Sequence, residues 1–322
     1  MLLEHLRGQR TLFFGGKGGV GKTTLAAATA TALAAESRRV LLVSTDPAHN
    51  LGHIWDRTIG DREVEVLPGL HVLEIDPAAQ TRRHLARVEG TMRAMMPEHL
   101  HGEVHRHLQL AEQSPGTHEA ALLERIAEIV ATAVGRFDHV VFDTAPSGHT
   151  SRLMDLPEIM SAWTDGLLDR RARSEKFSSV IRGLGPTGRD TMVAEDPVDR
   201  RNRKLRSILL ERREKFERLR AELSDPGACR FFIVLTAERM PVLETLEFHR
   251  GLTESGVTVG ACVVNRMSPL DQGTFLAERA AMEAGFVAQL LEGLPGTPVV
   301  QLPLLSGDVT GEAALREFAA ML

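Results

Sequence analysis

The chain has 322 residues, of which 43% are apolar and 25% charged, so it can bury a core and is neither disordered nor fibrous. Its 38 basic and 43 acidic residues give a formal net charge of −5, which argues against a surface built throughout for nucleic acid. The two cysteines, Cys229 and Cys262, are too few and too far apart in sequence for a disulfide framework or a CxxC-type zinc site, and we expect a reducing, cytoplasmic environment.

Short apolar runs alternate with helical patterns along most of the chain. The first run, 11–14, is followed by a glycine-rich loop and an alanine-rich helical stretch at 23–35. Because such runs are short and do not alternate apolar with polar residues, they predict an α/β fold with a mostly parallel sheet and helices on both faces. No apolar run is long enough to cross a membrane. The remaining strands are expected at 40–44, 70–75, 138–142, 231–236, 257–264 and 299–302.

Two longer segments show helical patterns and offer no strand. In the second of them, Asp196 and Pro197 predict the N-cap and first turn of a long charged helix that ends near Ser224. We therefore predict one α/β core that carries a discontinuous helical subdomain. The core is expected to comprise residues 1–76, 136–150 and 228–322, and the subdomain inserts residues 77–135 and 151–227.

The glycine-rich loop carries a phosphate-binding motif. Residues 16–23 read Gly-Lys-Gly-Gly-Val-Gly-Lys-Thr, which matches G-x-x-x-x-G-K-[ST] between a predicted strand and a predicted helix. Lys22 is expected to reach the terminal phosphates and the Thr23 hydroxyl to ligate Mg²⁺, whereas a plain glycine turn would need neither residue. The core is thus predicted to be a P-loop NTPase. Its loop residues that bind nucleotide are expected to be Gly16, Lys17, Gly18, Gly19, Val20, Gly21, Lys22, Thr23 and Thr24.

Lys17 follows the first glycine of the loop, in a chain that has only five lysines. This second lysine resembles the one that marks the deviant P-loop ATPases, which include the ParA, MinD, nitrogenase-iron-protein and ArsA families. In that group it reaches across a dimer interface to the partner's nucleotide. The resemblance implies a homodimer with ATP between two protomers and catalytic roles for both Lys17 and Lys22.

Two polar segments at predicted strand ends indicate which of these families the chain resembles most. Residues 44–51 read STDPAHNL and residues 143–150 read DTAPSGHT. Both resemble the switch segments of the ArsA family, which includes the arsenite-pump ATPase and the ATPase that targets tail-anchored membrane proteins. The resemblance implies that Asp46 orients the attacking water and that Asp143 lies beside Mg²⁺ and holds it through water. An aspartate at either position could instead cap a turn, but the sheet edge is where phosphate chemistry belongs.

Further segments resemble the side of the family's site that binds the base. Glu238 resembles a glutamate that contacts nucleotide, and Asn265 resembles an asparagine that reads adenine, as its amide can both donate and accept. Pro303 and Leu304 resemble the loop of the adenine pocket. The match extends from about residue 11 to residue 318, and the helical inserts are its least similar part.

The chain departs from the family at its cysteines. The zinc-binding CxxC pair of the tail-anchor ATPase and the three metalloid cysteines of the arsenite pump are both missing from the sequence. Cys229 and Cys262 lie on or beside predicted core strands. Because a soft-metalloid site needs thiolates, we expect neither a zinc site nor activation by arsenite.

Three features of the inserts have two interpretations each. Six of the 11 methionines fall there, which suits a groove for a hydrophobic client but also a helical core. Residues 165–220 hold 16 basic and ten acidic residues, which suits an anionic partner, although we favour a solvated helix face. Four histidines could bind a metal, although we favour a solvated stretch without nearby cysteine. They are His99, His101, His105 and His107.

The resemblance as a whole implies a cytoplasmic, Mg²⁺-dependent ATPase whose dimer opens and closes to bind and release a client, most readily a hydrophobic helix of a tail-anchored protein. Two alternatives stay open. One is an ATPase subunit that docks on a membrane protein and energises an anion or metalloid exporter. The other is a ParA- or MinD-like positioning switch, which ranks last because residues 311–322 lack the basic amphipathic character of a membrane helix. No nucleic-acid partner is expected.

Overall fold

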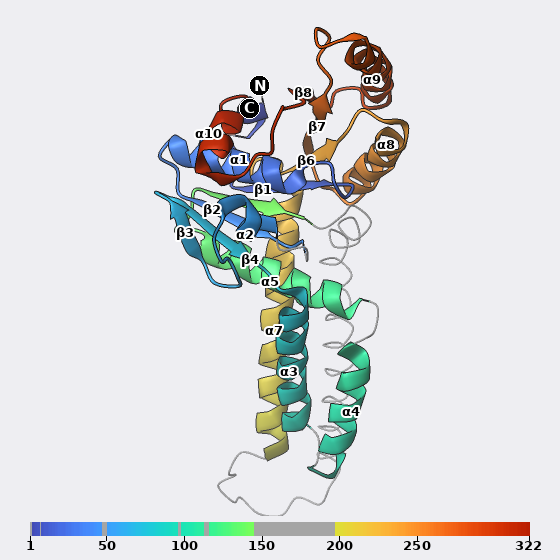
Figure 1. Ribbon diagram of the computed structural model, residues 1–322. Coiled ribbons are helices and arrows are strands. Elements are labelled where there is room, and N and C mark those ends of the chain that lie inside the picture. Colours follow the sequence, from blue (N-terminus) through green and yellow to red (C-terminus); the bar gives the residue numbers. More distant parts are fainter. Residues whose placement is uncertain (1, 7, 47–49, 96–97, 113–115, 145–196) are drawn as a thin grey trace, which may run out of the picture. The chain divides into compact units, whose positions relative to one another are not determined.

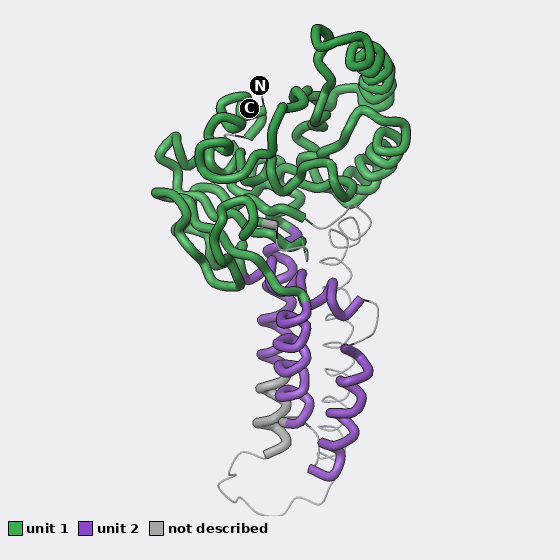
Figure 2. The backbone as a smooth tube through the Cα atoms, viewed as in Figure 1, with its two compact units in different colours: residues 1–77, 129–155, 221–322 green, residues 78–128, 156–220 purple. Residues whose placement is uncertain are grey.

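The computed structural model describes residues 2–6, 8–46, 50–95, 98–112, 116–144 and 197–322 (Figure 1). The chain forms two compact units (Figure 2). Unit 1 comprises residues 1–77, 129–155 and 221–322, and unit 2 comprises residues 78–128 and 156–220.

Unit 1 contains an eight-stranded sheet with the strand order β3-β4-β2-β5-β1-β6-β7-β8. Every neighbouring pair is parallel except β3 and β4. The predicted fold class is therefore confirmed, and each of the seven predicted runs overlaps an observed strand. The strands are β1 (Thr11–Gly16), β2 (Val40–Ser44), β3 (Val64–Leu67), β4 (Leu70–Glu74), β5 (His139–Asp143), β6 (Cys229–Leu235), β7 (Val259–Met267) and β8 (Val299–Pro303).

The helices lie on the sheet in unit 1 and pack against one another in unit 2. Short 3₁₀ turns form at Leu2–His5 and Glu98–Leu100. Unit 1 contains α1 (Lys22–Ala35), α2 (Asn50–Trp55), α8 (Arg239–Glu254), α9 (Thr274–Gly293) and α10 (Gly311–Ala319). The helices of the insert region are α3 (Pro77–Met95), α4 (His101–Glu112), α5 (Thr117–Ala133) and α7 (Pro197–Ser224).

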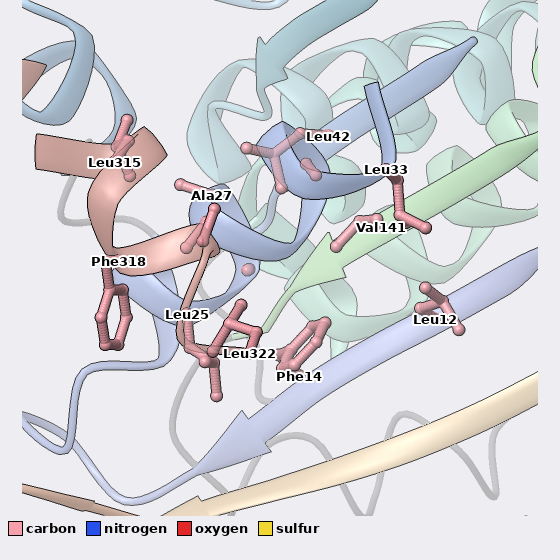
Figure 3. Close-up of a cluster of buried hydrophobic side chains, with 14 of the residues drawn as sticks. Leu12, Phe14, Leu25, Ala27, Leu33, Leu42, Val141, Leu315, Phe318 and Leu322 are labelled. Carbon is pink, nitrogen blue, oxygen red and sulfur yellow. The ribbon is translucent and has the colours of Figure 1, made fainter. Parts of the chain in front are cut away.

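One face of the sheet packs against α1 and α10. Side chains from β1, β2 and β5 meet those of the two helices in one buried cluster (Figure 3). Phe14 at the centre of this face and Leu25 on α1 are fully buried. The alanines of α1 let the helix approach the strands closely, so the carboxyl end of β1 and the start of α1 are held firmly by apolar burial.

The opposite face is filled by aromatic rings. Phe13 stacks on Phe142 with ring centroids 4.6 Å apart, and Phe231 meets Phe248 of α8 edge to face at 5.4 Å. Successive residues of a strand point to opposite faces, so Phe13 and Phe14 are buried on different sides of β1. Burial on both sides explains why these strands appear in the sequence as unbroken apolar runs.

The sequence did not indicate β3. This four-residue strand pairs antiparallel with β4 at the sheet edge, and the turn between them contains Gly69 at φ +80°. Its mixed pattern, Val-Glu-Val-Leu, reflects an edge strand that is only half covered. In the other half of the sheet, β7, which lies between β6 and the edge strand β8, extends three residues beyond its predicted end, so Asn265 and Arg266 belong to the strand itself.

Polar contacts join two helices of unit 2, α3 and α5. His84 of α3 lies 2.6 Å from Glu124 of α5, and both side chains are largely buried. Arg87 donates to Glu128 at 2.7 Å. Burial alone would raise the pKa of Glu124, but the hydrogen bond from His84 and the charges of Arg87 and Arg212 hold it below its ordinary value. The carboxylate therefore contributes most to stability while it is charged.

The histidine cluster of the first insert has partners within the protein. The ring of His101 lies 3.0 Å from the Arg93 carbonyl oxygen, and that of His105 lies 3.1 Å from Glu89. Among the described residues, no three histidine, cysteine or acidic side chains are grouped so as to hold a metal ion.

None of the helices in the described ranges combines the length and the apolar character that a membrane span requires. Most of the basic segment, 165–196, lies outside the described residues, and so do four of the six insert methionines, Met96, Met154, Met160 and Met192.

Candidate nucleotide-binding site

The phosphate-binding motif connects β1 to α1. Gly16 is the last residue of β1 and Lys22 is the first residue of α1. Strands β2 and β5 end at the same edge of the sheet, where Ser44 and Asp143 are register partners. In an open α/β sheet, ligands bind at the carboxyl ends of the strands. The topology therefore brings the loop, Asp143 and the segment after β2 to one place.

Two glycines of the loop occupy positions that a side chain could not share. A Cβ atom on Gly16 would lie 2.1 Å from the carbonyl oxygen of Val234 on β6. Gly21 has φ +94°, and its Cβ would lie 2.5 Å from the amide nitrogen of Asn265. The motif thus needs glycine for close packing against β6 and β7 as well as for a left-handed turn.

Lys22 is nearly buried at the start of α1. Its ammonium group donates a 2.9 Å hydrogen bond to the carbonyl oxygen of Lys17, so it lies inside the curve of the loop. Burial lowers the pKa of Lys22, and the nearby charges of Asp143 and Asp46 partly offset that effect. A buried cation at a helix N-terminus is suited to phosphate oxygens.

Asp143 is fully buried and only partly satisfied. Its Oδ2 atom accepts a 3.2 Å hydrogen bond from the Ser44 hydroxyl, while its Oδ1 atom has no hydrogen-bond partner within the part of the chain that the structure describes. Burial raises the pKa of Asp143 to about 7, against the opposing effects of Thr23 and Lys22. A hard divalent cation with oxygen ligands would compensate such a carboxylate. Asp143 and Thr23 therefore fit Mg²⁺.

Asp46 lies two residues after the end of β2. Its backbone N–H donates to the Ser44 hydroxyl at 3.3 Å, and the N–H and hydroxyl of Thr45 both donate to the carbonyl oxygen of Asp143. These bonds tie the start of the segment to the end of β5. The charge of Asp46 acts on both Lys22 and Asp143, so the three side chains share one site. Within the two switch-like segments, residues 47–49 and 145–150 lie outside the described residues.

Lys17 has a partner that the sequence did not indicate. Its ammonium nitrogen lies 2.7 Å from a carboxylate oxygen of Glu244 on α8, 227 residues away in the chain. Both side chains stay substantially exposed, at 48% for Lys17 and 36% for Glu244. Lys17 is therefore free of deep packing and can reorient once this ion pair opens.

Two residues at the end of β7 donate hydrogen bonds to the phosphate loop. Asn265 donates to the Val20 carbonyl oxygen at 2.9 Å, and the Arg266 guanidinium donates to that of Gly19 at 3.1 Å. The N–H of Leu304 donates to the Met267 carbonyl oxygen at 2.8 Å. The structure thus brings Asn265 to the loop, whereas the resemblance implied that this residue reads adenine, a contact that stays a prediction. Pattern reasoning missed Arg266, whose φ of +61° marks an unusual backbone position.

Glu238 precedes α8 and is directed to α9. Its carboxylate pairs with Arg279 at 3.2 Å, and 53% of its side chain is exposed. Thus, of the predicted base-side residues, Asn265 contacts the loop directly and Glu238 is tied to α9 through Arg279.

A strand, a glycine loop with a buried lysine, a helix and a carboxylate at the end of the neighbouring strand define a P-loop nucleotide-binding fold. Comparison with known proteins agrees: the ArsA family, described as anion-transporting ATPases, matches residues 9–322. The chain belongs to this family, and the predicted resemblance is confirmed.

The relatives carry two kinds of name. The chain is 33% identical over 318 residues to the arsenical pump-driving ATPase of Acidiphilium multivorum, in an alignment that covers 96% of this chain and 48% of that protein. It is 30% identical over 318 residues to the putative arsenical pump-driving ATPase 2 of Aquifex aeolicus, with 97% and 99% covered. It is 29% identical over 315 residues to the ATPase ASNA1 homolog 1 of Paramecium tetraurelia, with 97% and 91% covered. The chain thus spans about half the length of the Acidiphilium relative, and the names do not decide between two roles.

Proposed function

We propose that this protein is a cytoplasmic, Mg²⁺-dependent ATPase that works as a homodimer with ATP bound between the protomers. The observation that supports this most is the convergence of Lys22, Asp46 and Asp143 at one sheet edge, with Lys17 exposed beside them. A buried lysine, an orphaned carboxylate oxygen and a glycine loop are the parts that phosphoryl transfer requires.

Each residue has a task in this scheme. Lys22 leaves the Lys17 carbonyl oxygen and binds terminal phosphate oxygens. Thr23 and, through water, Asp143 would hold Mg²⁺, which would neutralise phosphate charge. Asp46 orients the attacking water and accepts its proton. The base-side contacts would come from four residues: Glu238, Asn265, Pro303 and Leu304.

The cross-protomer role of Lys17 explains why so exposed a lysine is placed in the loop. A lysine that served only its own nucleotide would be directed inward as Lys22 is, whereas Lys17 extends outward to Glu244. In the closed dimer, Lys17 would leave Glu244 and place its charge on the partner's nucleotide. Catalysis then depends on dimer closure.

The client we propose is a hydrophobic helix, as in tail-anchored protein targeting. Support comes from the separate compact unit built of helices and from a relative named as an ASNA1 homolog. The cysteines count against a metalloid: Cys229 and Cys262 are both fully buried, and burial raises the pKa of Cys262 to about 12. Buried neutral thiols are poor ligands for a soft metalloid.

The second candidate is an ATPase subunit that docks on a membrane protein and energises the export of an anion. The family description and the arsenical pump relatives favour it. With the thiols buried, the exported species would then be an anion recognised without cysteine.

An ATPase assay on the purified chain discriminates between the targeting role and the export role when a tail-anchor peptide or arsenite is added. We expect turnover in Mg²⁺-ATP, capture of a tail-anchor peptide by the ATP-bound dimer, and no stimulation by arsenite. Capture should fail for a peptide of equal length whose apolar residues are replaced by serine. Arsenite stimulation without peptide capture would overturn the targeting role and support the pump.

A further inference from the structure

A buried carboxylate outside the residues assigned above lies at the base-side edge of the site. Glu283 of α9 is 2% exposed. Its Oε2 atom accepts the backbone N–H of Ser268 at 2.8 Å, and its Oε1 atom accepts the Ser268 hydroxyl at 2.9 Å. The guanidinium of Arg279 also donates to Oε1, at 2.8 Å. Three donors from two elements thus fix this side chain, and a charge buried so deeply is retained only where it is paired.

The first arm of this cluster leads to the phosphate loop. Ser268 directly follows β7, three residues after Asn265 and two after Arg266. Those two side chains donate to the carbonyl oxygens of Val20 and Gly19. The bonds from Ser268 to Glu283 therefore anchor the short segment that holds the loop in its curve.

The second arm leads to the start of α8. The Nη2 atom of Arg279 lies 3.2 Å from a carboxylate oxygen of Glu238, while its Nε atom donates to Glu283. Glu283 thus determines where Arg279 lies, and Arg279 in turn restrains Glu238 in front of α8. Both arms belong to unit 1.

We propose that Glu283 is a positioning residue of the nucleotide site: through Ser268 it fixes the strand end that grips the phosphate loop, and through Arg279 it fixes Glu238. The inference rests on the proposed binding of ATP. Glu283 does not reach the loop itself, so its loss should weaken ATP binding without changing the chemical step. It sets the KM for ATP and leaves kcat intact.

The test compares Glu283→Gln with a matched variant elsewhere in unit 1. Glu222 is also a largely buried carboxylate held by three donors, two from Arg10 and one from the Thr11 hydroxyl. It belongs to α7, and its contacts are at the start of β1, the opposite end of that strand from the phosphate loop. Glu222→Gln should therefore lower the melting temperature by a comparable amount without changing the KM. For Glu283→Gln we expect the KM for ATP to rise about tenfold, with kcat within about twofold of wild type, because charge-assisted bonds are lost.

A milder variant keeps the test informative if Glu283→Gln folds poorly. Ser268→Ala removes one hydroxyl bond and should raise the KM about threefold. The double variant should show less than the product of the two effects, because both act through one contact. Suppose that wild type binds and hydrolyses ATP, but that neither Glu283→Gln nor Ser268→Ala raises the KM more than Glu222→Gln does. The positioning role of Glu283 is then refuted, while the proposed ATPase function stands. If wild type does not bind ATP, the proposed function fails, and the role of Glu283 fails with it.

Discussion

The ion pair between Lys17 and Glu244 predicts that Glu244 restrains the enzyme. If Lys17 must leave Glu244 to reach a partner's nucleotide, then closure requires the pair to open first. Glu244→Gln keeps the size of the side chain and removes its charge. The variant should therefore release Lys17 and favour the closed, hydrolysing dimer.

The exposure of the Lys17 and Glu244 side chains determines how large the rate increase should be. With 48% and 36% of the side chains exposed, water screens the 2.7 Å pair strongly. Exposed pairs of this kind are worth about 0.2–1 kcal/mol. If one such pair must open in each protomer, removing it should increase kcat/KM by up to about fivefold at low salt, since about 1.4 kcal/mol is a factor of ten. The gain should shrink as salt rises, because the Debye length falls to about 3 Å at 1 M.

The assay is steady-state phosphate release at low protein concentration, where closure limits the rate. A matched control is Glu211→Gln, which breaks the exposed pair with Lys215 at 3.4 Å on α7 and should leave kcat/KM unchanged. The ratio of Glu244→Gln to wild type is compared at low and at high salt. A rate equal to or below that of wild type at low salt would refute the restraint and would show that Glu244 assists turnover.

Three further predictions concern single side chains. Gly21→Ala places a Cβ 2.5 Å from the Asn265 amide at φ +94°, so binding of a fluorescent ATP analogue should weaken at least about tenfold; unchanged affinity would contradict the packing argument. Because the folded pKa of Glu124 lies below its ordinary 4.5, the stability it contributes is present above that pH and is lost as pH falls through the folded value. Acid unfolding followed by circular dichroism should accordingly flatten in Glu124→Gln, and an unaltered profile would be contrary to expectation. Finally, Cys229 and Cys262 should react with a thiol reagent only after denaturant is added, whereas rapid labelling of native protein would show that the burial is wrong.

The sequence predicts those features of the fold that depend on only a few neighbouring residues. The strands of the sheet centre are visible because burial on both faces demands unbroken apolar runs, and the phosphate loop is visible because Gly16 and Gly21 each meet a steric limit. The start of α7 at Pro197 follows from the fixed φ of proline in a first turn. Each of these features is decided within a few residues.

Contacts between distant segments are invisible to such patterns. Glu244 lies on an ordinary charged helix, and only the fold shows that it faces Lys17. Glu283 looks like a surface residue of α9 until Ser268 is seen to cover it. The short edge strand β3 escaped notice because its exposed face breaks the apolar run. The domain boundaries and the nucleotide contacts stay predictions.

The most direct test of the sandwich-dimer mechanism is the oligomeric state of Asp46→Asn with Mg²⁺-ATP, measured by sedimentation together with phosphate release. Without the carboxylate that orients water, this variant should bind ATP, fail to hydrolyse it, and persist as a closed dimer. Lys17→Ala should abolish turnover, and adding it to Asp46→Asn should return the protein to the nucleotide-free assembly state. A monomeric Asp46→Asn that retains ATP, or a Lys17→Ala monomer that hydrolyses at the wild-type rate, would contradict the two-protomer mechanism.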